Sequence, residues 1–562
     1  MPDSIPDAIR QLNQRLSALD TDREEFRTHW AEIRDVMAPH RGRGLSGQKG
    51  GYEDVDGSKK NATIYDPTGV EAVKTLASGM QSGLTSKSRP WFRLGFADHD
   101  LSDNHAVRGW LFEVERRMRS VFEGSNFYNA CFHTYSELGA FQTAAFSIME
   151  SYEHVINCRP YTVGEYYLAA GPNGRVNTFV RRFWPTSLQM VEEFGEDSVS
   201  AQVRMAAQGT GTETRHEVIQ FIEPNDDRFT LKDAMKRPWR SIYYEAGRSD
   251  KPLRVRGFEE FPVMAPRWDV VGNGVYGVGG PGMDALPDVK GLQKMREKYY
   301  VGVDKAIDPP LQGPAEMRHE EVNDIPGGLT FISTMTNQWS GFRPLSDRPV
   351  DLASMRAAIT GDRQTVNEHF YVDLFRMISS LPLRSGTTAT EIAERHEEKL
   401  QILGPVLERV HTEMLNPAID RTFAIMLRNG LIPDPPEAIA GMPMRVEYVS
   451  LLAQAQKLVG LGAIEGLVGF VGGLASVKPD VLDKVDLDEA IDQYADALGV
   501  PPTVVVSDEL VAQIRQARAE QEQAQQMGEA AMVAAQGAET LSKADMASDN
   551  ALNALLGRSP GQ

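Results

Sequence analysis

The glycines at 272, 274 and 277 match, letter for letter, the Gly-x-Gly-x-x-Gly fingerprint that binds the pyrophosphate of dinucleotides. In that fingerprint a strand precedes the glycines and a helix follows them, so that backbone amides and the helix N-terminus face the phosphates. Here a Gly-Pro-Gly turn follows at 280–282, and no strand ending in an acidic residue appears about 20 positions later. The glycines therefore predict a hinge over 272–282, and nucleotide binding is the weaker interpretation.

Two other groups of side chains have the chemistry to bind phosphate or metal, but not the required pattern. Lys87 and Ser88 resemble the end of a phosphate-binding P-loop, yet the glycine that precedes the lysine of a P-loop is absent. His154, Cys158 and His216 are scattered without the spacing of metal ligands. We interpret all five as packing or surface residues, and we expect neither a metal nor a cofactor.

A denser cluster of acid–base groups lies between positions 391 and 398. Its members are Glu391, Glu394, His396, Glu397 and Glu398. Such groups hold the metals of nucleases and hydrolases, but here they fall on different faces of one expected helix. The chain also lacks His-Glu-x-x-His and Gly-x-Ser-x-Gly motifs. A metal-dependent nuclease or hydrolase is therefore an alternative hypothesis, and the protein is not expected to be an enzyme.

The charge balance limits how this chain could hold nucleic acid. It has 78 acidic and 59 basic residues and a net charge of −19, whereas static DNA binding depends on Lys and Arg that neutralise phosphates. Any contact with DNA is expected to be loose or transient. The two cysteines, Cys131 and Cys158, do not make a disulfide framework, and no signal peptide is recognisable, so synthesis in a reducing cytoplasm is expected.

Hydrophobic periodicity predicts an α+β fold that is predominantly helical. Helices are expected at 21–38, at 70–80 and through most of 103–150. Asp66 or Thr68 could cap the second of these.

Short β-branched runs after residue 150 predict a modest, mostly antiparallel sheet. A segment rich in glycine, serine and basic residues, 40–60, is expected to be an exposed loop, or else an arm that reaches a neighbouring subunit or DNA. The expected strands lie at 161–168, 176–183, 216–223, 239–245 and 261–268.

The middle of the chain predicts an antiparallel helical hairpin. One helix starts near residue 286 and ends before Asp308. A compact excursion over 308–348 follows, with a strand expected at 329–333, and a second helix returns over 351–378.

A longer helix follows this hairpin at once. The breaker is the Leu-Pro-Leu-Arg-Ser-Gly sequence at 381–386, and the restart has a capping-box pair, Thr388 and Glu391. An apolar stripe continues for about 40 residues, which would span roughly 60 Å. Pro405 and Pro417 lie inside it, so kinks are expected there.

The C-terminal quarter contains one segment that resembles a membrane span. Residues 458–476 are apolar apart from Glu465, but they contain six glycines and lack aromatic anchors. We favour a buried helix pair and expect no membrane contact, with an envelope-associated scaffold as an alternative. A strand is expected at 444–449, a helix at 490–497, and a charged helix from 508 that frays toward the C-terminus.

Four blocks in fixed order resemble the head-to-tail connector (portal) proteins of short-tailed bacteriophages. The resemblance covers roughly residues 20 to 520 and is more specific than any single short motif. The blocks are Tyr65-Asp66-Pro67-Thr68-Gly69 with 76–85 and Pro90-Trp91-Phe92; Tyr276-Gly277 to Asp288; Thr388 to Ile392 with Arg395 and Glu398; and Val446 to Ser450 with 452–456.

The resemblance implies a portal fold whose regions assemble as a ring. The loop at its centre would be a tunnel loop projecting into a channel, formed by Leu381, Pro382, Leu383, Arg384, Ser385, Gly386 and Thr387, with Thr388 and Glu391 at the start of the long helix. The implied regions are a wing (1–285), a first stem helix (286–307), a clip (308–349), a second stem helix (350–379), the tunnel loop (380–388), the rest of the wing (389–450), and a wing end and crown with a flexible C-terminal tail (451–562).

The resemblance also implies partners and location. Such proteins form a ring of twelve copies at one capsid vertex of the virion, through which double-stranded DNA is packaged and ejected. The major capsid protein and scaffold, the terminase and a tail adaptor protein would be its partners.

Simple geometry is consistent with this role. Twelve helices about 10 Å apart make a circle about 38 Å across at their axes. Subtracting a helix diameter of about 10 Å leaves roughly 28 Å, wide enough for duplex DNA of about 20 Å. An acidic subunit favours sliding over sticking, and Arg384, the one charge of the loop, would either form a positive ring or pair with the long helix.

Overall fold

The computed structural model divides the chain into two compact units, residues 1–459 and 460–562. It is mixed helix and sheet, and mostly helical. The residues that it describes are 5–45, 64–96, 105–225, 237–248, 251–308, 311–312, 343–344, 351–380, 401–436, 439, 445–449, 469–474, 485, 487–488, 491 and 508–542.

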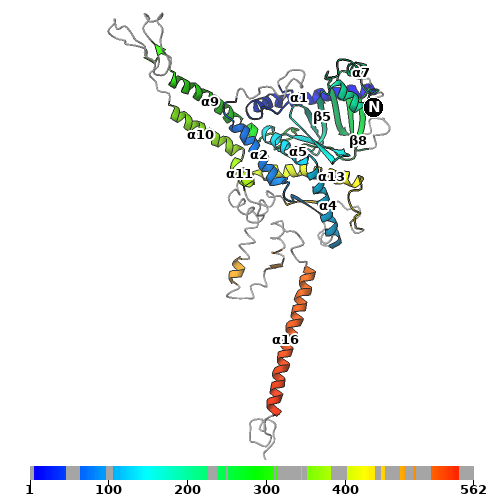
Figure 1. Cartoon of the computed structure of the whole chain (residues 1–562), viewed down its shortest axis with the longest axis vertical. Helices are drawn as coiled ribbons and strands as arrows, with labels where there is room; N and C mark the ends of the chain where they lie inside the picture. The colour runs from blue at the N-terminus through cyan, green and yellow to red at the C-terminus, as the bar shows by residue number, and fades with distance from the viewer. Residues whose placement is uncertain are drawn as a thin grey trace, which may run out of the picture. The chain divides into compact units, whose positions relative to one another are not determined.

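In the first unit, one long helix crosses a five-stranded antiparallel sheet (Figure 1). The helix α1 (Ile5–Met37) begins well before the predicted residue 21. Its first half buries Ile9 and Leu12 against Ile219 on one face of the sheet. Its second half enters the main core with Trp30.

The five strands are β4 (Tyr166–Ala170), β5 (Val176–Phe183), β6 (Val218–Pro224), β7 (Trp239–Glu245) and β8 (Arg254–Phe258), in that spatial order. The predictions for β5 and β7 are confirmed to the residue. Strand β8 was not predicted. On the opposite face, Val218 packs with Met190 of α6 (Ser187–Phe194), and α7 (Ala201–Gln208) completes that cluster.

A second sheet corrects two expectations. Strands β2 (Ala145–Ser151) and β3 (Val155–Tyr161) form a hairpin where the sequence predicted a helix to residue 150 and no strand before residue 161. The strand predicted at 161–168 overlaps β4 from Tyr166 onward. Alternation does not identify β2, because its first four residues are all buried. Only β9 (Val263–Met264) remains of the strand predicted at 261–268.

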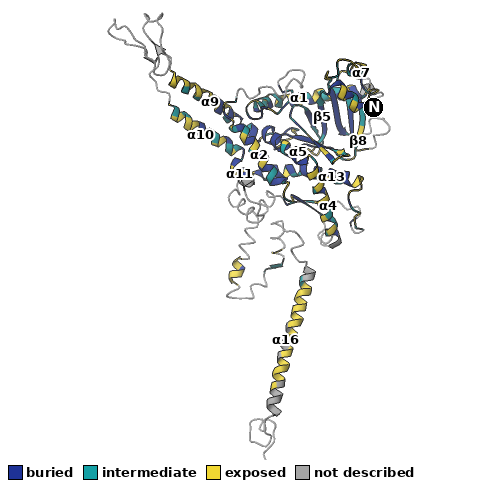
Figure 2. Cartoon of the chain, in the orientation of Figure 1, coloured by how far each residue is buried: buried dark blue, intermediate teal, exposed yellow. Residues whose placement is uncertain are grey.

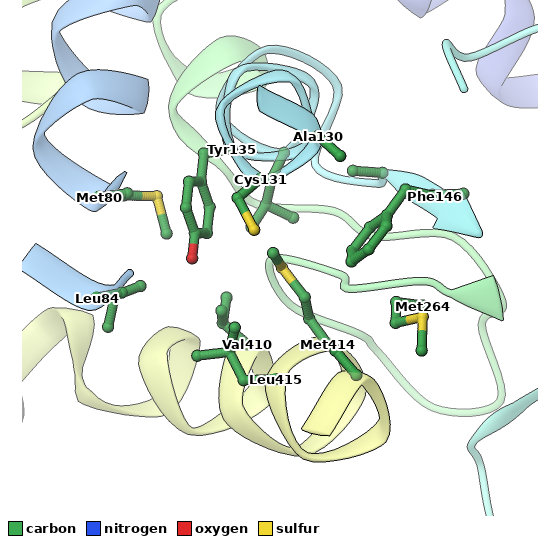
Figure 3. Close-up of a cluster of buried hydrophobic side chains, with 14 of the residues drawn as sticks. Met80, Leu84, Ala130, Cys131, Tyr135, Phe146, Met264, Val410, Met414 and Leu415 are labelled. Atoms are coloured by element: carbon green, nitrogen blue, oxygen red, sulfur yellow. The ribbon is translucent and has the colours of Figure 1, made fainter. Parts of the chain in front are cut away.

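The main core lies where several helices meet this second sheet. Helices α2 (Thr68–Leu84), α4 (His105–Gly124) and α5 (Phe127–Phe141) supply most of the buried side chains. Figure 3 shows Met80, Tyr135 and Met414 from three separate elements closing on one another. Cys131 and Cys158 are buried, and neither forms a disulfide.

The long helix is interrupted where a proline was predicted to kink it. Residues 401–410 are helical through Pro405. A π-helical turn, His411–Leu415, then leads into α13 (Asn416–Arg428), with Pro417 in its first turn. Because proline has no N–H and its ring crowds the preceding carbonyls, the regular α pattern is lost just before it.

The predicted strand near 444–449 is confirmed as β12 (Arg445–Tyr448), which pairs antiparallel with β1 (Phe92–Gly95). In the second unit, residues 469–474 are helical. The helix predicted to start at residue 508 is confirmed as α16 (Asp508–Ser542), and it continues well past its charged first part. Among the helices in the described part of the chain, none combines the length and apolarity that a bilayer crossing requires. Most of the suspected apolar run, 458–476, lies outside that part.

Candidate functional site: a helical hairpin and its anchor

The predicted helical hairpin is confirmed. Helix α9 (Leu286–Ile307) leads out, and α10 (Leu352–His369) returns beside it (Figure 1). Between them, the described residues of the excursion form a two-residue ladder of β10 (Leu311–Gln312) and β11 (Arg343–Pro344). The strand predicted at 329–333 lies outside the described residues. At 1.5 Å per residue α9 is about 33 Å long.

Much of this hairpin has little cover within its own chain (Figure 2). Near the end of α9 the side chains of Tyr300, Val301 and Ile307 are 43%, 46% and 78% exposed. In α10 the buried residues are Ile359 and Val366. Exposed apolar side chains grouped on one element are typical of interaction surfaces.

The hairpin does not share the acidity of the whole chain. Helix α9 carries five Lys or Arg residues against three acidic ones, and α10 carries two of each. A chain with a net charge of −19 thus projects a hairpin of +2 from these two helices. Both helices therefore lack the dense acidic surface that would strongly repel DNA and the dense basic surface that would hold it.

The hairpin is anchored to the rest of the unit by a buried carboxylate, Asp66, just before α2. Arg363 of α10 donates from Nε and Nη2 to Oδ2 of Asp66, at 3.0 and 2.6 Å. The other oxygen, Oδ1, accepts from the backbone N–H of Thr68 at 3.1 Å. The N-cap position of α2 is Pro67, and no side chain makes the cap hydrogen bond, so the predicted capping by Asp66 or Thr68 is wrong. Asp66 is fully buried, so this pair fixes α10 against α2.

Helix α9 is attached at the same point by an amide. The Oε1 of Gln293 accepts from the backbone N–H groups of Tyr65 and Asp66, both at 2.8 Å. Its Nε2 donates to the carbonyl of Asp66 at 2.8 Å. One side chain thus satisfies three backbone groups of the turn around the buried Asp66, and the loss of these hydrogen bonds would be costly.

The electrostatics of the anchor favour the charged carboxylate. Burial raises the pKa of Asp66, but hydrogen bonds from Thr68 and Arg363, with the positive charge of Arg363, outweigh burial, so the pKa lies below its usual value. Asp66 therefore stays ionised at neutral pH and keeps its bonds to both partners.

Small residues of α2 let the hairpin and its continuation approach closely. A Cβ on Gly69 would lie 3.3 Å from Val289 of α9. A Cβ on Gly79 would lie 2.3 Å from Phe375, which belongs to α11 (Val372–Ser380). These contacts give the glycines of the two N-terminal sequence blocks a packing role.

The Gly-rich segment at 272–282 holds the start of the hairpin, and two of its glycines, Gly277 and Gly282, lie too close to other backbone to leave room for a nucleotide. A Cβ on Gly277 would lie 2.0 Å from the carbonyl oxygen of Gln142, and one on Gly282 would lie 2.0 Å from that of Ala140. The N–H of Gly277 donates to Thr143 Oγ1 at 2.7 Å. The glycines therefore serve close backbone packing against the end of α5.

The sequence predicted one continuous helix over 351–378, and the structure shows two. The first, α10, ends at His369, and α11 begins at Val372 after Tyr371, which has a φ of +52°. A non-glycine residue in this region is strained, and burial of Phe370 and Phe375 on either side holds it there. The apolar periodicity continues across the break, which explains why it escaped detection.

The predicted tunnel loop, 381–387, lies outside the described residues, and so do Thr388 and Glu391. The remaining members of the acidic cluster, up to Glu398, lie outside them as well. Within the described part of the chain, no three His, Cys, Asp or Glu residues are grouped so as to hold a metal ion. His154, Cys158 and His216 are likewise not brought together as ligands there.

Sequence reasoning missed the two residues that attach the hairpin, Arg363 and Gln293. They lie 297 and 227 positions from Asp66. The one available signal was the sequence Asp66-Pro67-Thr68. A carboxylate that becomes buried in the fold needs a cation or hydrogen-bond donors from other parts of the chain.

Comparison with known proteins gives consistent matches across almost the whole chain. The model of a family described as "Bacteriophage head to tail connecting protein" matches residues 10–505. A "Portal protein" of Salmonella phage epsilon15 is 43% identical over 548 residues, which cover 97% of each chain. A "Probable portal protein" of Bordetella phage BPP-1 is 40% identical over 547 residues, which cover 97% of this chain and 96% of that relative.

Proposed function

The chain belongs to the family of bacteriophage head-to-tail connecting proteins, and from this premise we propose that twelve copies close into a ring around a DNA channel. The ring occupies one capsid vertex of the virion. The terminase drives double-stranded DNA in through it, and the tail, attached by an adaptor protein, receives the DNA on ejection. The capsid protein and scaffold contact its outer surface.

The observation that carries this proposal is the hairpin of α9 and α10, which is firmly attached at its base and uncovered beyond it. Tyr300, Val301 and Ile307 are exposed in one copy and are covered by neighbouring hairpins in the ring. Twelve such hairpins leave a bore of about 28 Å when inner helices are about 10 Å apart.

The surface of α10 suits the wall of such a bore. Its exposed residues include Ala353, Ala357, Ala358 and Gly361, and its four charges cancel. Duplex DNA, which carries one negative charge per about 1.7 Å of its axis, meets no row of cations that would stop it.

The second unit contains another element that a single copy does not cover. All side chains described in α16 are exposed except Val511, which is partly buried. Met527, Met532 and Val533 are each more than two-thirds exposed. We assign α16 to the crown, where helices of neighbouring copies bury these apolar groups.

Electron microscopy of the purified full-length chain tests ring closure. We expect rings with a central hole, and we expect Val301→Asp with Ile307→Asp to yield single copies whose thermal unfolding is unchanged. Met205→Asp, at a 68% exposed position on α7, is the control that keeps its rings. Solitary particles without a hole in the unaltered protein would refute the ring.

The segment 381–387 is proposed to line the channel as a tunnel loop, with Arg384 as a ring of positive charge. Deleting it should leave rings intact but impair genome packaging or retention in phage assembled with the variant. Arg384→Gln separates the two roles left open for this residue. Loss of packaging with normal thermal stability supports the ring of charge, whereas loss of stability with normal packaging supports a salt bridge to the long helix.

A further inference from the structure

A cleft of about 1020 Å³ lies in the first unit, away from the hairpin. Its walls are the segment 40–43 after α1, the end of β3, the end of β5, and α6. Its volume is at the upper end of those that hold small ligands, about 300–1,000 Å³.

Arginines dominate the cleft, and not all are neutralised. Arg41 pairs with Glu137 at 3.2 Å, and Arg43 pairs with Glu165 at 3.1 Å. The exposed Arg159 has no ion-pair partner among the described residues.

Two further carboxylates line the cleft, and they do not neutralise its excess of positive charge. Glu193 is held by Arg254 at 2.8 Å, so Glu192 is the one carboxylate of the cleft without an ion pair to a described residue.

Arg181, on β5, is the unusual member. It is 6% exposed, and its Nε has no hydrogen-bond partner. Its guanidinium lies over the rings of Phe183 and Tyr161, at 4.2 and 5.1 Å from their centroids. No carboxylate within the described residues forms an ion pair with it. Burial lowers the pKa of Arg181, and a buried cation without a partner is costly.

We propose that this cleft binds an acidic segment of a partner protein, one of whose carboxylates pairs with Arg181 and Arg159. A carboxylate is planar and accepts two parallel bonds from a guanidinium. Binding would supply the negative charge that the guanidinium of Arg181 has no partner for within its own chain's described residues. The rings of Tyr161 and Phe183 would keep the guanidinium in a fixed orientation.

The walls favour a polypeptide over DNA. Pro160, Trp184 and Pro185 line the cleft beside the arginines, and such apolar rings contact side chains and backbone of an extended peptide. A DNA backbone presents a continuous row of phosphates, and this row would meet the carboxylate of Glu192, which lines the cleft without an ion pair to a described residue.

Fluorescence anisotropy with the full-length protein and a fluorescein-labelled octaglutamate peptide tests the site. We expect saturable binding that weakens about tenfold in Arg181→Met and severalfold in Arg159→Ala. Arg175→Ala, an exposed arginine in the turn between β4 and β5, is the matched control and should bind as the unaltered protein does. Removing an unpaired buried charge should leave the melting temperature of Arg181→Met unchanged or higher.

Competition separates the sources of negative charge. Acidic peptide should displace the probe, while inorganic phosphate and a 20-base-pair duplex at equal charge should not. Equal binding by all variants would overturn the site. Displacement by phosphate at the same concentration would show a free-anion site, and displacement by the duplex would show a nucleic-acid surface; either would overturn the polypeptide assignment. None of these results depends on whether rings form.

Discussion

The main core of the first unit and the hairpin differ in where their contacts come from. In the core, Trp91, Phe122 and Phe127 pack on one another, and each is at most 1% exposed. In the hairpin, Ile307 is 78% exposed at the end of α9, far along the chain from the buried Leu286, Val289 and Leu292 at its start. One region is completed by its own chain, whereas in the proposed ring the other is completed by neighbours.

This difference predicts that substitutions in the two regions fail in different assays. A core substitution lowers the free energy of unfolding of the single copy. A substitution beyond the base of the hairpin leaves that free energy almost unchanged and affects assembly. The anchor at Asp66 lies between these cases, because Asp66 is buried in the core unit and binds Arg363 of the hairpin.

Gly282→Ala should have the largest effect. The added Cβ would lie 2.0 Å from the carbonyl oxygen of Ala140, a distance that only movement of the backbone can relieve. We expect a loss of about 4 kcal/mol or more and little folded protein, measured by urea unfolding and soluble yield. Gly124→Ala, at the exposed end of α4 with nothing within 4 Å, is the control. Normal folding of Gly282→Ala would show that the core is not closely packed there.

Arg363→Met should loosen the hairpin without unfolding the core. It leaves the carboxylate of Asp66 buried without its main cation, at a cost of about 2–4 kcal/mol. We expect faster protease cleavage within α9 and α10, measured by mass spectrometry, at an unchanged core melting temperature.

The double variant Asp66→Asn with Arg363→Met should recover part of this loss, because it no longer buries an unpaired charge. Gln364→Met, on the exposed side of the same helix, controls for the new side chain. Additive effects of the two substitutions would contradict a direct Asp66–Arg363 coupling.

The core should also respond to acid through His411. Burial lowers the pKa of this imidazole to about 4, and its ring stacks on Tyr448 at 3.8 Å. Since the unfolded chain takes up the proton near pH 6.5 and the folded one only near pH 4, stability falls as the pH drops between these values.

The slope attributable to one such group is about 1.4 kcal/mol per pH unit. The measurement is the difference in urea unfolding between the unaltered protein and His411→Phe, which keeps the stack. Identical pH profiles would mean that His411 does not titrate differently in the folded state.

Elements with a clear residue pattern could be predicted from the sequence. The two helices of the hairpin were found by their apolar period, and strands β5 and β7 by their β-branched and aromatic residues. Strand β2 was missed because Ile148 is its one β-branched residue and its first four residues, all buried, give no alternation. The break at Tyr371 was also missed, since its cause is packing of Phe370 and Phe375 by distant segments and not a local glycine or proline.

The site was predictable only in part for the same reason. The sequence singled out Asp66 beside Pro67 and Thr68, but as a possible helix cap, which it is not. Its ion pair with Arg363 and the role of Gln293 depend on residues more than 200 positions away. The first family block includes Asp66 without giving the physical reason, which is the attachment of the hairpin.

Gly361→Ala should have the smallest effect and makes the comparison sharper. A Cβ at this position in α10 meets nothing within 4 Å in the single copy, so alanine should stabilise the helix by about 0.5–1 kcal/mol. The same holds for Gly291 in α9.

If the exposed side of α10 faces a water-filled bore, rings of Gly361→Ala form as before and resist heat slightly better. If instead rings fail while the single copy is more stable, a neighbouring subunit contacts α10 at Gly361, and the wall of the bore must be formed by another face of the hairpin. Counting rings by electron microscopy beside a thermal melt of the same sample decides between these two arrangements.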